Sequence, residues 1–471
     1  MKERSLFNNT PPSEELINRY KRYTAGESAG GYFDVEEVEM LADHFLQYNT
    51  EEAIRVIDMG LKQHPNHQDL MIGRIKILAE QGNLNEAMHL LNLLMNQECY
   101  EAQLVKIEIL TKFNRVEEAK KIALNILAQP QEEAELTVLD ISDIFRDCDQ
   151  FETSLFILEQ REKTNALSVD MLFEKAYCLE QIGNYQDAIS TYQEIIKVDS
   201  YIGEAWFNLG QVYYTLQEYK DALHAYTMCV TINEDDTIAW IQKGHTHFFL
   251  KEIDNAHTCY TKCIDSYKDK WELYIFIAEC FALKQEYEDA ILYYKASLKE
   301  RLDNHKAHIG LATCEIEMGN YPAATKLLQE AIKICPEAYE AWFYLGEIEN
   351  RQQNIEQAIT FYQKAYTLND SDLIVAMTLG NIFANNRAYE QAIPYYHKAH
   401  ENADELQRTE ILILLATCYF YINNYDIALY HIEKAMKEDT NSLNLFYSLC
   451  PEGMEKISEI IKKTNDKQQN K

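Results

Sequence analysis

The hydrophobic and polar positions of this chain follow one pattern that returns at a nearly constant interval. Trp206, Leu209 and Tyr213 mark one apolar stripe, and Ala222 with Tyr226 marks a second stripe shortly afterwards. Residues three and four apart share one face of a helix, so each stripe predicts an amphipathic helix. The two stripes together predict a pair of helices that are joined by a short turn.

A small residue returns at the position of Ala222 along most of the chain. Successive members lie 34, 32 and 35 residues apart, then 34 apart seven times, and finally 36 apart. The members are Ala53, Ala87, Ala119, Ser154, Ala188, Ala222, Ala256, Ala290, Ala324, Ala358, Ala392 and Ala428. A helix pair cannot bury its apolar face alone, so the recurrence predicts about twelve stacked units over roughly residues 34–442.

The motif Trp206-x2-Leu209-Gly210-x2-Tyr213, followed by Ala222-x3-Tyr226 at a period of 34 residues, resembles the tetratricopeptide repeat. The resemblance implies an all-α, right-handed superhelical solenoid of about twelve helix-turn-helix repeats with a C-terminal capping helix. It also implies that the first helix of each repeat, the A helix, lines a concave groove. The second helix of each repeat is called the B helix below.

One position of the A helix separates two regions of the repeat array. This crossing position, where the A helix meets its B helix, needs a small side chain. From residue 169 onward it holds glycine or alanine, as at Gly210 and Gly346, whereas the first four units carry Leu41, Ile75, Ile107 and Ser142. We favour compensating repacking as the reason, and a specialised docking or dimer surface is the alternative. Units 1–4 therefore form a degenerate region, residues 34–168, and units 5–12 a near-consensus region, residues 169–442.

The two ends of the chain lie outside the repeats. Residues 1–33 are predicted to be a flexible head, with a short helix from Ser13 to Tyr23 and a glycine-rich link over 24–31. Asp34 and Glu37 form a capping box at the start of the first unit, flanked by the apolar residues Phe33 and Val38. Residues 443–471 are predicted to hold a capping helix over 451–463 and a frayed tail.

The composition limits which classes of partner and which cellular compartment are expected. Lys and Arg total 44 and Asp and Glu total 76, so the formal net charge is −32. Such a chain repels nucleic acid and anionic membranes, and we expect neither as a partner. Eleven cysteines occur without any CxxC pair, which is typical of reduced cytosolic thiols. Because the chain also shows no signal peptide and no long apolar run, we expect a cytoplasmic protein.

Little in the chain predicts chemistry. His245, His247, Cys259 and Cys263 are the best metal candidates, but on a helix the two histidines point about 200° apart. The segments outside the repeats are too short for a separate catalytic domain. We therefore predict no metal, no cofactor and no enzymatic activity. An enzyme of unfamiliar kind, with a bound cofactor or metal, is the least favoured alternative.

The resemblance implies which A-helix positions face the groove, and several of these carry aromatic or amide side chains here. The candidates for peptide binding are Phe173, Tyr177, Phe207, Asn208, Gln211, Tyr214, Ile241, His245, Phe248, Glu279, Phe343, Tyr344 and Glu347. Aromatic anchors among amides and acids favour a neutral-to-basic peptide or helix with apolar anchors. The leading hypothesis is a scaffold or adaptor without catalysis. The alternative is a regulator whose superhelical pitch responds to a bound peptide.

Overall fold

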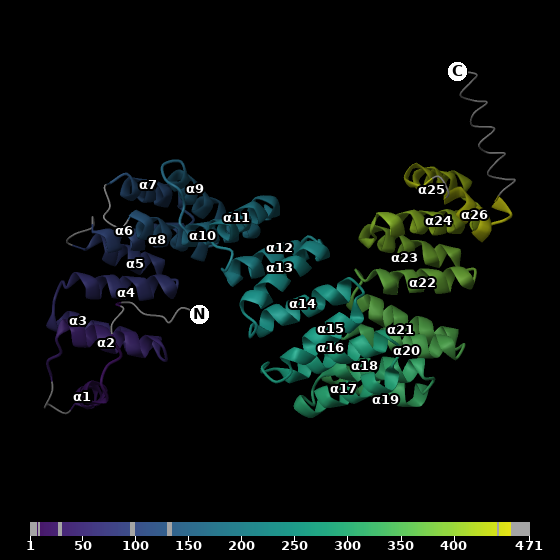
Figure 1. Cartoon of the computed structure of the whole chain (residues 1–471), viewed down its shortest axis with the longest axis horizontal. Helices are drawn as coiled ribbons and strands as arrows, with labels where there is room; N and C mark the ends of the chain where they lie inside the picture. Colours follow the sequence, from purple (N-terminus) through teal and green to yellow (C-terminus); the bar gives the residue numbers. More distant parts are fainter. Residues whose placement is uncertain are drawn as a thin grey trace, which may run out of the picture. The chain divides into compact units, whose positions relative to one another are not determined.

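The structure is a computed structural model that describes residues 7, 10–26, 31–94, 99–129, 134–439 and 442–453. Over these ranges every regular element is a helix. The chain divides into two compact units, Met1–Asp236 and Thr237–Lys471. We describe each unit by itself (Figure 1).

The first unit holds helices α1 to α13. Their bounds are α1 (Glu14–Thr24), α2 (Val35–Leu46), α3 (Thr50–Gln63), α4 (Gln68–Glu80), α5 (Leu84–Asn92), α6 (Tyr100–Lys112), α7 (Val116–Leu127), α8 (Ala134–Asp147), α9 (Phe151–Glu162), α10 (Val169–Ile182), α11 (Tyr185–Val198), α12 (Gly203–Thr215) and α13 (Tyr219–Ile232). In the pairs from α2/α3 to α12/α13 the two helices pack on each other, and consecutive pairs are in contact.

The second unit holds helices α14 to α26. Their bounds are α14 (Thr237–Phe249), α15 (Ile253–Cys263), α16 (Lys270–Leu283), α17 (Tyr287–Glu300), α18 (His305–Glu317), α19 (Tyr321–Ile334), α20 (Tyr339–Arg351), α21 (Ile355–Leu368), α22 (Leu373–Asn385), α23 (Tyr389–Asn402), α24 (Glu405–Tyr421), α25 (Tyr425–Glu438) and α26 (Ser442–Leu449). Consecutive pairs from α14/α15 to α24/α25 again stack on one another.

The helix pattern confirms the predicted all-α fold of twelve pairs, which run from α2/α3 to α24/α25 in the described residues. Helix α1 precedes them, and the hydroxyl of Ser13 accepts a hydrogen bond from the Leu16 amide at its start. Helix α26 follows the last pair. The capping helix predicted over 451–463 lies outside the described residues beyond 453, as do residues 27–30 of the glycine-rich link.

The predicted capping box opens the first repeat. The Glu37 amide donates to Oδ1 of Asp34 at 2.8 Å, and the Asp34 amide donates to Oε2 of Glu37 at 3.1 Å. These two bonds satisfy amides that the first turn of α2 leaves without partners. Phe33 and Val38 on either side are fully buried. The sequence pattern therefore fixes where α2 begins.

Glycine at the crossing position leaves room for a tyrosine ring of the B helix. A methyl group at Gly210 would lie 2.7 Å from Cε1 of Tyr226, and one at Gly346 would lie 2.8 Å from the ring of Tyr362. Gly244 and Gly380 meet Tyr260 and Tyr396 in the same way. All four rings are buried, so the tyrosine fills the space that the missing side chain leaves.

The first three repeats carry a large residue on the A helix at this crossing. Leu41, Ile75 and Ile107 are fully buried at the crossing position of their A helices. Ala123 stands in the third repeat at the register of Tyr226, and it belongs to the same core cluster as Ile107. In the fourth repeat Oγ of Ser142 lies 2.6 Å from Oγ of Ser154. In the third repeat a large A-helix residue thus meets a small B-helix residue, while Ile57, Leu91 and Leu158 stand at that B-helix register in the other three repeats.

A left-handed residue ends the A helix in every repeat after the first. In each case the backbone φ angle is positive, between 58° at Asp149 and 83° at Gly183. The residues are Gly82, Asn114, Asp149, Gly183, Gln217, Lys251, Gln285, Gly319, Gln353, Arg387 and Asn423. Next to Gln217, the Glu218 amide donates to the Tyr213 carbonyl at 2.9 Å, which is the bond pattern of a Schellman cap. Most of these turns therefore hold a side chain where glycine is the least strained residue.

Candidate peptide-binding faces

The first unit carries six of the predicted groove residues on two neighbouring A helices. Phe173 and Tyr177 lie on α10, and Phe207, Asn208, Gln211 and Tyr214 lie on α12. The side chain of Tyr177 is 42% exposed. Gln211 is also exposed, and Phe173, Phe207, Asn208 and Tyr214 are half-buried. The two helices therefore present accessible aromatic surface between amide side chains.

Each of these four aromatic side chains is held by a second ring. Phe173 meets Tyr192 of α11 edge-on, with 6.3 Å between ring centroids, and Phe207 meets Tyr226 of α13 at 5.8 Å. Tyr177 packs on Phe151 of α9 at 6.2 Å. Tyr214 packs on Tyr219 at 5.6 Å. Edge-to-face contacts of this kind restrict the rings, so little side-chain entropy remains to be lost on binding.

The polar groups behind this face are already engaged in part. The Tyr192 hydroxyl donates to Oε1 of Glu180 on α10. Burial raises the pKa of Glu180 above its usual range, although the bond from Tyr192 opposes that shift. Burial also raises the pKa of Tyr214. The Asn208 side chain also bonds to Tyr192, so the exposed amide of Gln211 is better placed than Glu180 to contact a peptide backbone.

The second unit holds the remaining seven candidates, and Ile241 does not serve as an accessible surface residue. Its side chain is only 7% exposed and packs in a core cluster with Leu273 and Ile277 of α16. The neighbouring repeat therefore covers the apolar side chain. Phe248, on the same helix, is half-buried against that cluster and lies 6.4 Å from the ring of Phe249.

His245 is anchored within the second unit. Its Nδ1 shares a hydrogen bond of 2.9 Å with the Tyr260 hydroxyl, and its ring stands perpendicular to Phe276 at 4.6 Å. Burial lowers the pKa of His245 to about 4, so the imidazole is neutral at pH 7. His245 thus contributes a positioned neutral ring to the A-helix face.

Glu279 of α16 is the most strongly perturbed carboxyl group among the predicted residues. Burial raises its pKa to about 7, although the positive charge of Lys306 on α18 opposes that shift. Glu279 is therefore only partly ionised at neutral pH. A cation that approached this side chain would favour its ionised form, which makes Glu279 responsive to a charged ligand.

Phe343, Tyr344 and Glu347 lie together on α20. Phe343 is held between Tyr344 at 5.6 Å and Tyr362 at 5.3 Å, measured between ring centroids. Glu347 accepts hydrogen bonds from Arg351, whose Nη2 lies 2.8 Å from Oε1 of Glu347 and 2.6 Å from Oε1 of Glu317. The charge of Glu347 is thus already compensated by Arg351, a partner that the repeat pattern did not indicate.

The structure gives different partners to His245 and His247, two of the four residues considered as metal ligands; the other two are Cys259 and Cys263. His247 pairs with Glu252 at 2.7 Å, whereas His245 bonds to Tyr260. Burial raises the pKa of both Cys259 and Cys263 to about 11, so these thiols are protonated at neutral pH. In the part of the chain that the structure describes, no group of three or more His, Cys, Asp or Glu residues could hold a metal ion.

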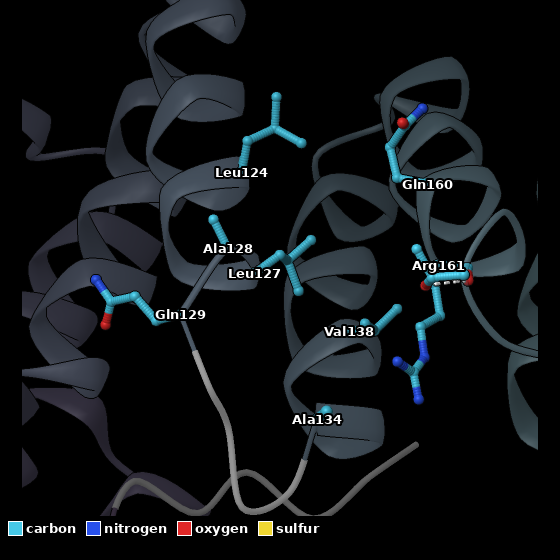
Figure 2. Close-up of a pocket in the computed structure, with 9 residues that line it drawn as sticks. Leu124, Leu127, Ala128, Gln129, Ala134, Val138, Gln160 and Arg161 are labelled. Atoms are coloured by element: carbon cyan, nitrogen blue, oxygen red, sulfur yellow. Dashed lines mark hydrogen bonds between the residues drawn. The ribbon is translucent and has the colours of Figure 1, made fainter.

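A cavity of about 260 Å³ lies between α7, α8 and α9, and the sequence pattern did not indicate it. Figure 2 shows Leu124 and Leu127 on one side of this space and Gln160 and Arg161 on the other. Nε of Arg161 is buried without a hydrogen-bond partner among the described residues, while its Nη1 donates to Asn165 at 3.0 Å. Residues 130–133, which join α7 to α8, lie outside the described residues.

The length and apolar character of the described helices bear on whether one of them could span a membrane. None of them combines the length and the apolar character that crossing a bilayer needs.

Comparison with known proteins identifies the class to which this architecture belongs. Models of the tetratricopeptide repeat family match residues 170–199, 203–236, 241–307 and 309–372, and a further one matches 281–334. The matched stretches extend over helices α10 to α21. Residues 170–372 of the chain therefore consist of tetratricopeptide repeats. Proteins of this class are in general protein-interaction scaffolds, typically without catalysis, and these repeats support that broad role.

Several solved structures resemble parts of the chain. A tetratricopeptide repeat protein from Parabacteroides merdae is 16% identical, with a TM-score of 0.45, and the alignment covers 53% of this chain and 98% of that one. MamA is 18% identical, with a TM-score of 0.33 and coverage of 34% and 93%. The APC/C hetero-tetramer Cut9-Hcn1 is 13% identical, with a TM-score of 0.40 and coverage of 93% and 99%. These sequence identities and TM-scores are too low to support a statement about the function of the present chain. No curated protein matches it.

Proposed function

We propose that this protein is a non-catalytic scaffold that binds a peptide or helix of a partner protein through the A helices α10 and α12. The observation that carries the proposal is the set of accessible aromatic side chains on these two helices, Phe173, Tyr177, Phe207 and Tyr214. Exposed aromatic surface of this kind is enriched at protein interfaces and supplies much of their affinity.

The surroundings of these rings support a neutral-to-basic peptide with apolar anchors. Asn208 and Gln211 offer amide donors and acceptors to a peptide backbone. The net charge of −32 favours approach of a basic partner and disfavours nucleic acid. All eleven cysteines are free, and we infer a reducing compartment such as the cytoplasm. On the second unit, Glu279, Phe343 and Tyr344 are proposed to extend recognition to further parts of the partner.

The test is a peptide array followed by fluorescence anisotropy with the best binders. The variant Tyr177→Ala/Phe207→Ala/Tyr214→Ala removes three rings from α10 and α12. If each ring contributes about 1 kcal/mol, the affinity should fall on the order of 100-fold. The matched control Tyr32→Ala/Tyr48→Ala/Tyr201→Ala removes three tyrosines that are 66%, 76% and 80% exposed elsewhere in the first unit.

The outcome depends on which variant loses affinity while remaining helical by circular dichroism. Loss in the α10/α12 variant alone supports the proposal. Equal affinity of wild type and that variant would contradict it, and equal loss in both variants would point to unspecific apolar contact.

A further inference from the structure

An open cleft of about 820 Å³ lies between the B helices α5 and α7 in the first unit, and α6 also contributes to its walls. A smaller space of about 370 Å³ adjoins it and shares Met88, Asn92 and Arg115 with it. None of the predicted groove residues lines either space. This basic cleft is thus separate from the aromatic face of α10 and α12, and it is defined by Met88, Asn92, Lys106, Leu110, Arg115, Glu118, Lys121 and Ile122.

The basic cleft combines apolar and cationic side chains. Met88 and Ile122 are half-buried, and Leu110 is 3% exposed. Around them lie Lys106 and Lys121, which come from α6 and α7. A side chain of a bound peptide could therefore cover the apolar residues while its neighbours reach the two lysines.

The cations of the cleft differ in whether the protein already neutralises them. Arg115 donates two hydrogen bonds of 2.7 Å to the carboxylate of Glu118, so that pair carries no net charge. Among the described residues, no carboxylate lies within ion-pair distance of Lys106 or Lys121. Lys121 still acts on Glu118 through space, since its charge, after the bond from Arg115, helps to lower the pKa of that carboxyl group, but no described carboxylate bonds to either lysine in a chain whose formal net charge is −32.

In two other repeats the cation at the register of Lys106 has an acidic partner, whereas Lys243 at the same register lies over the ring of Trp240. Arg74 and Lys175 precede Ala87 and Ala188 by the same number of residues as Lys106 precedes Ala119. Nε of Arg74 lies 2.9 Å from Oδ1 of Asp58, on the preceding B helix.

Lys175 likewise pairs with Glu162 of α9 at 2.7 Å. In the cleft, Asn92 occupies the place on α5 that Asp58 occupies on α3, since each follows the small residue of its repeat by the same number of positions. The amide carries no charge, so Lys106 lacks on α5 the acid that Arg74 meets on α3. The position that corresponds to Glu162 is residue 95, which lies outside the described residues.

We propose that the basic cleft binds an acidic peptide segment of a partner protein. Carboxylates of the peptide pair with Lys106 and Lys121, and an aliphatic side chain between them contacts Met88, Leu110 and Ile122. The complementarity is local, because at physiological salt charges more than about 8 Å away are largely screened. A short acidic segment therefore responds to the two lysines, while a long polyanion would also meet the surrounding acidic surface.

The test uses a short fluorescein-labelled peptide of glutamates around two central leucines and the full chain. The variant Lys106→Met/Lys121→Gln removes both free cations, and the expected loss of affinity is on the order of tenfold or more. The control Lys197→Gln/Lys220→Gln removes two exposed lysines of α11 and α13, so its net charge changes by the same amount. Raising salt from about 50 to about 300 mM should weaken binding to wild type and to the control.

A second variant supplies the missing carboxylate instead of removing a cation. Asn92→Asp places an acid where α3 carries Asp58, so Lys106 becomes paired within the protein and affinity for the acidic peptide should fall. Both variants should keep the far-ultraviolet circular dichroism of the wild type, since no buried apolar group is removed.

Three results would overturn the proposal. The control variant could lose as much affinity as Lys106→Met/Lys121→Gln, which would mean that total charge decides binding. A peptide with glutamine in place of glutamate could bind equally well, which would leave only apolar contact. A short oligothymidylate could bind more tightly than the acidic peptide, which would identify a nucleic-acid site. The peptides used for the aromatic face are different, so failure here leaves the proposed function untouched.

Discussion

The third repeat and the later ones fill the same space between their two helices in opposite ways. In the later repeats the A helix carries glycine, as at Gly346, and the B helix inserts the ring of Tyr362. In the third repeat the A helix carries Ile107 and the B helix carries Ala123. The volume needed at the crossing is shared differently between the helices, and close packing is kept in both regions.

This comparison explains why the repeat pattern weakens before residue 169 although the helix pairs continue. The motif describes one way of filling the crossing, with the small residue on the A helix. A helix pair needs only that the two side chains fit together. The degenerate repeats are therefore packed units of the same fold, and their surfaces are free to differ, as the basic cleft of α5, α6 and α7 does.

The largest expected effect comes from forcing the early arrangement onto a later repeat. Gly346→Ile places a branched side chain where even a methyl group would lie 2.8 Å from the ring of Tyr362. Overpacking of this kind should destabilise α20 and α21 by about 3 kcal/mol or more. Hydrogen exchange measured by mass spectrometry reports this locally, because a repeat array does not unfold as one two-state unit.

The double variant Gly346→Ile/Tyr362→Ala is the control for that prediction. It reproduces the pairing of Ile107 with Ala123, so it should recover part of the lost protection. A double variant that exchanges as fast as the single one would show that the two arrangements are not interchangeable.

Truncation in the degenerate region should have a slightly smaller effect. Ile107 is fully buried, so Ile107→Ala leaves a cavity that Ala123 cannot fill and should cost about 2–3 kcal/mol. Hydrogen exchange in α6 and α7 is the measurement, and Ile107→Val should cost only about 1 kcal/mol. Unchanged exchange in Ile107→Ala would mean that the third repeat packs loosely and lacks the close packing of the later repeats.

The near-consensus region should also respond to pH through Glu279. The folded-state pKa of Glu279 is raised from 4.5 to about 7, so the folded chain binds more protons than the unfolded chain between these values. The free energy of unfolding therefore falls as pH rises through this window. Glu279→Gln removes that loss, and the variant should gain up to about 2 kcal/mol over wild type at pH 7.5.

Thermal unfolding of both proteins at pH 4.5 and pH 7.5 tests the Glu279 prediction. Near pH 4.5 the acid is protonated in the folded state and about half protonated in the unfolded state, so most of the difference should be gone and the two proteins should melt at similar temperatures. A difference that is the same at both pH values would show that the carboxyl group does not titrate as burial requires.

The smallest expected effect concerns the turns that end the A helices. Lys251 has a φ of 64°, whereas Gly183 holds the equivalent place with a φ of 83°. Lys251→Gly relieves the strain of the left-handed conformation but increases the entropy of the unfolded chain, so a net gain of about 0.5 kcal/mol is expected. Gly183→Ala should lose about 1 kcal/mol, and urea denaturation followed by circular dichroism compares the two. A loss in Lys251→Gly would mean that its side chain makes a stabilising contact.

The candidate site was less predictable than the fold. The A-helix positions Tyr177 and Gln211 are exposed, as a groove residue must be, yet Ile241 at a comparable position is buried against α16. The charge of Glu347 is compensated by Arg351, which also bonds to Glu317 of the preceding A helix. These differences arise because a side chain's exposure depends on the neighbouring repeat, and no single repeat motif describes its neighbour.

The sequence by itself determined that the chain is all helical, that it forms twelve helix pairs, and where the first pair begins. A fixed period of small and aromatic residues suffices for this, because it encodes contacts within one repeat and local caps. Only the tertiary structure decided which side chains meet between repeats. Tyr294 of α17 lies against Gly310 of α18, and Arg74 pairs with Asp58 of the preceding repeat, whereas Lys106 lines a cleft with the uncharged Asn92. Such contacts depend on the register between helices of different repeats, which the period leaves open.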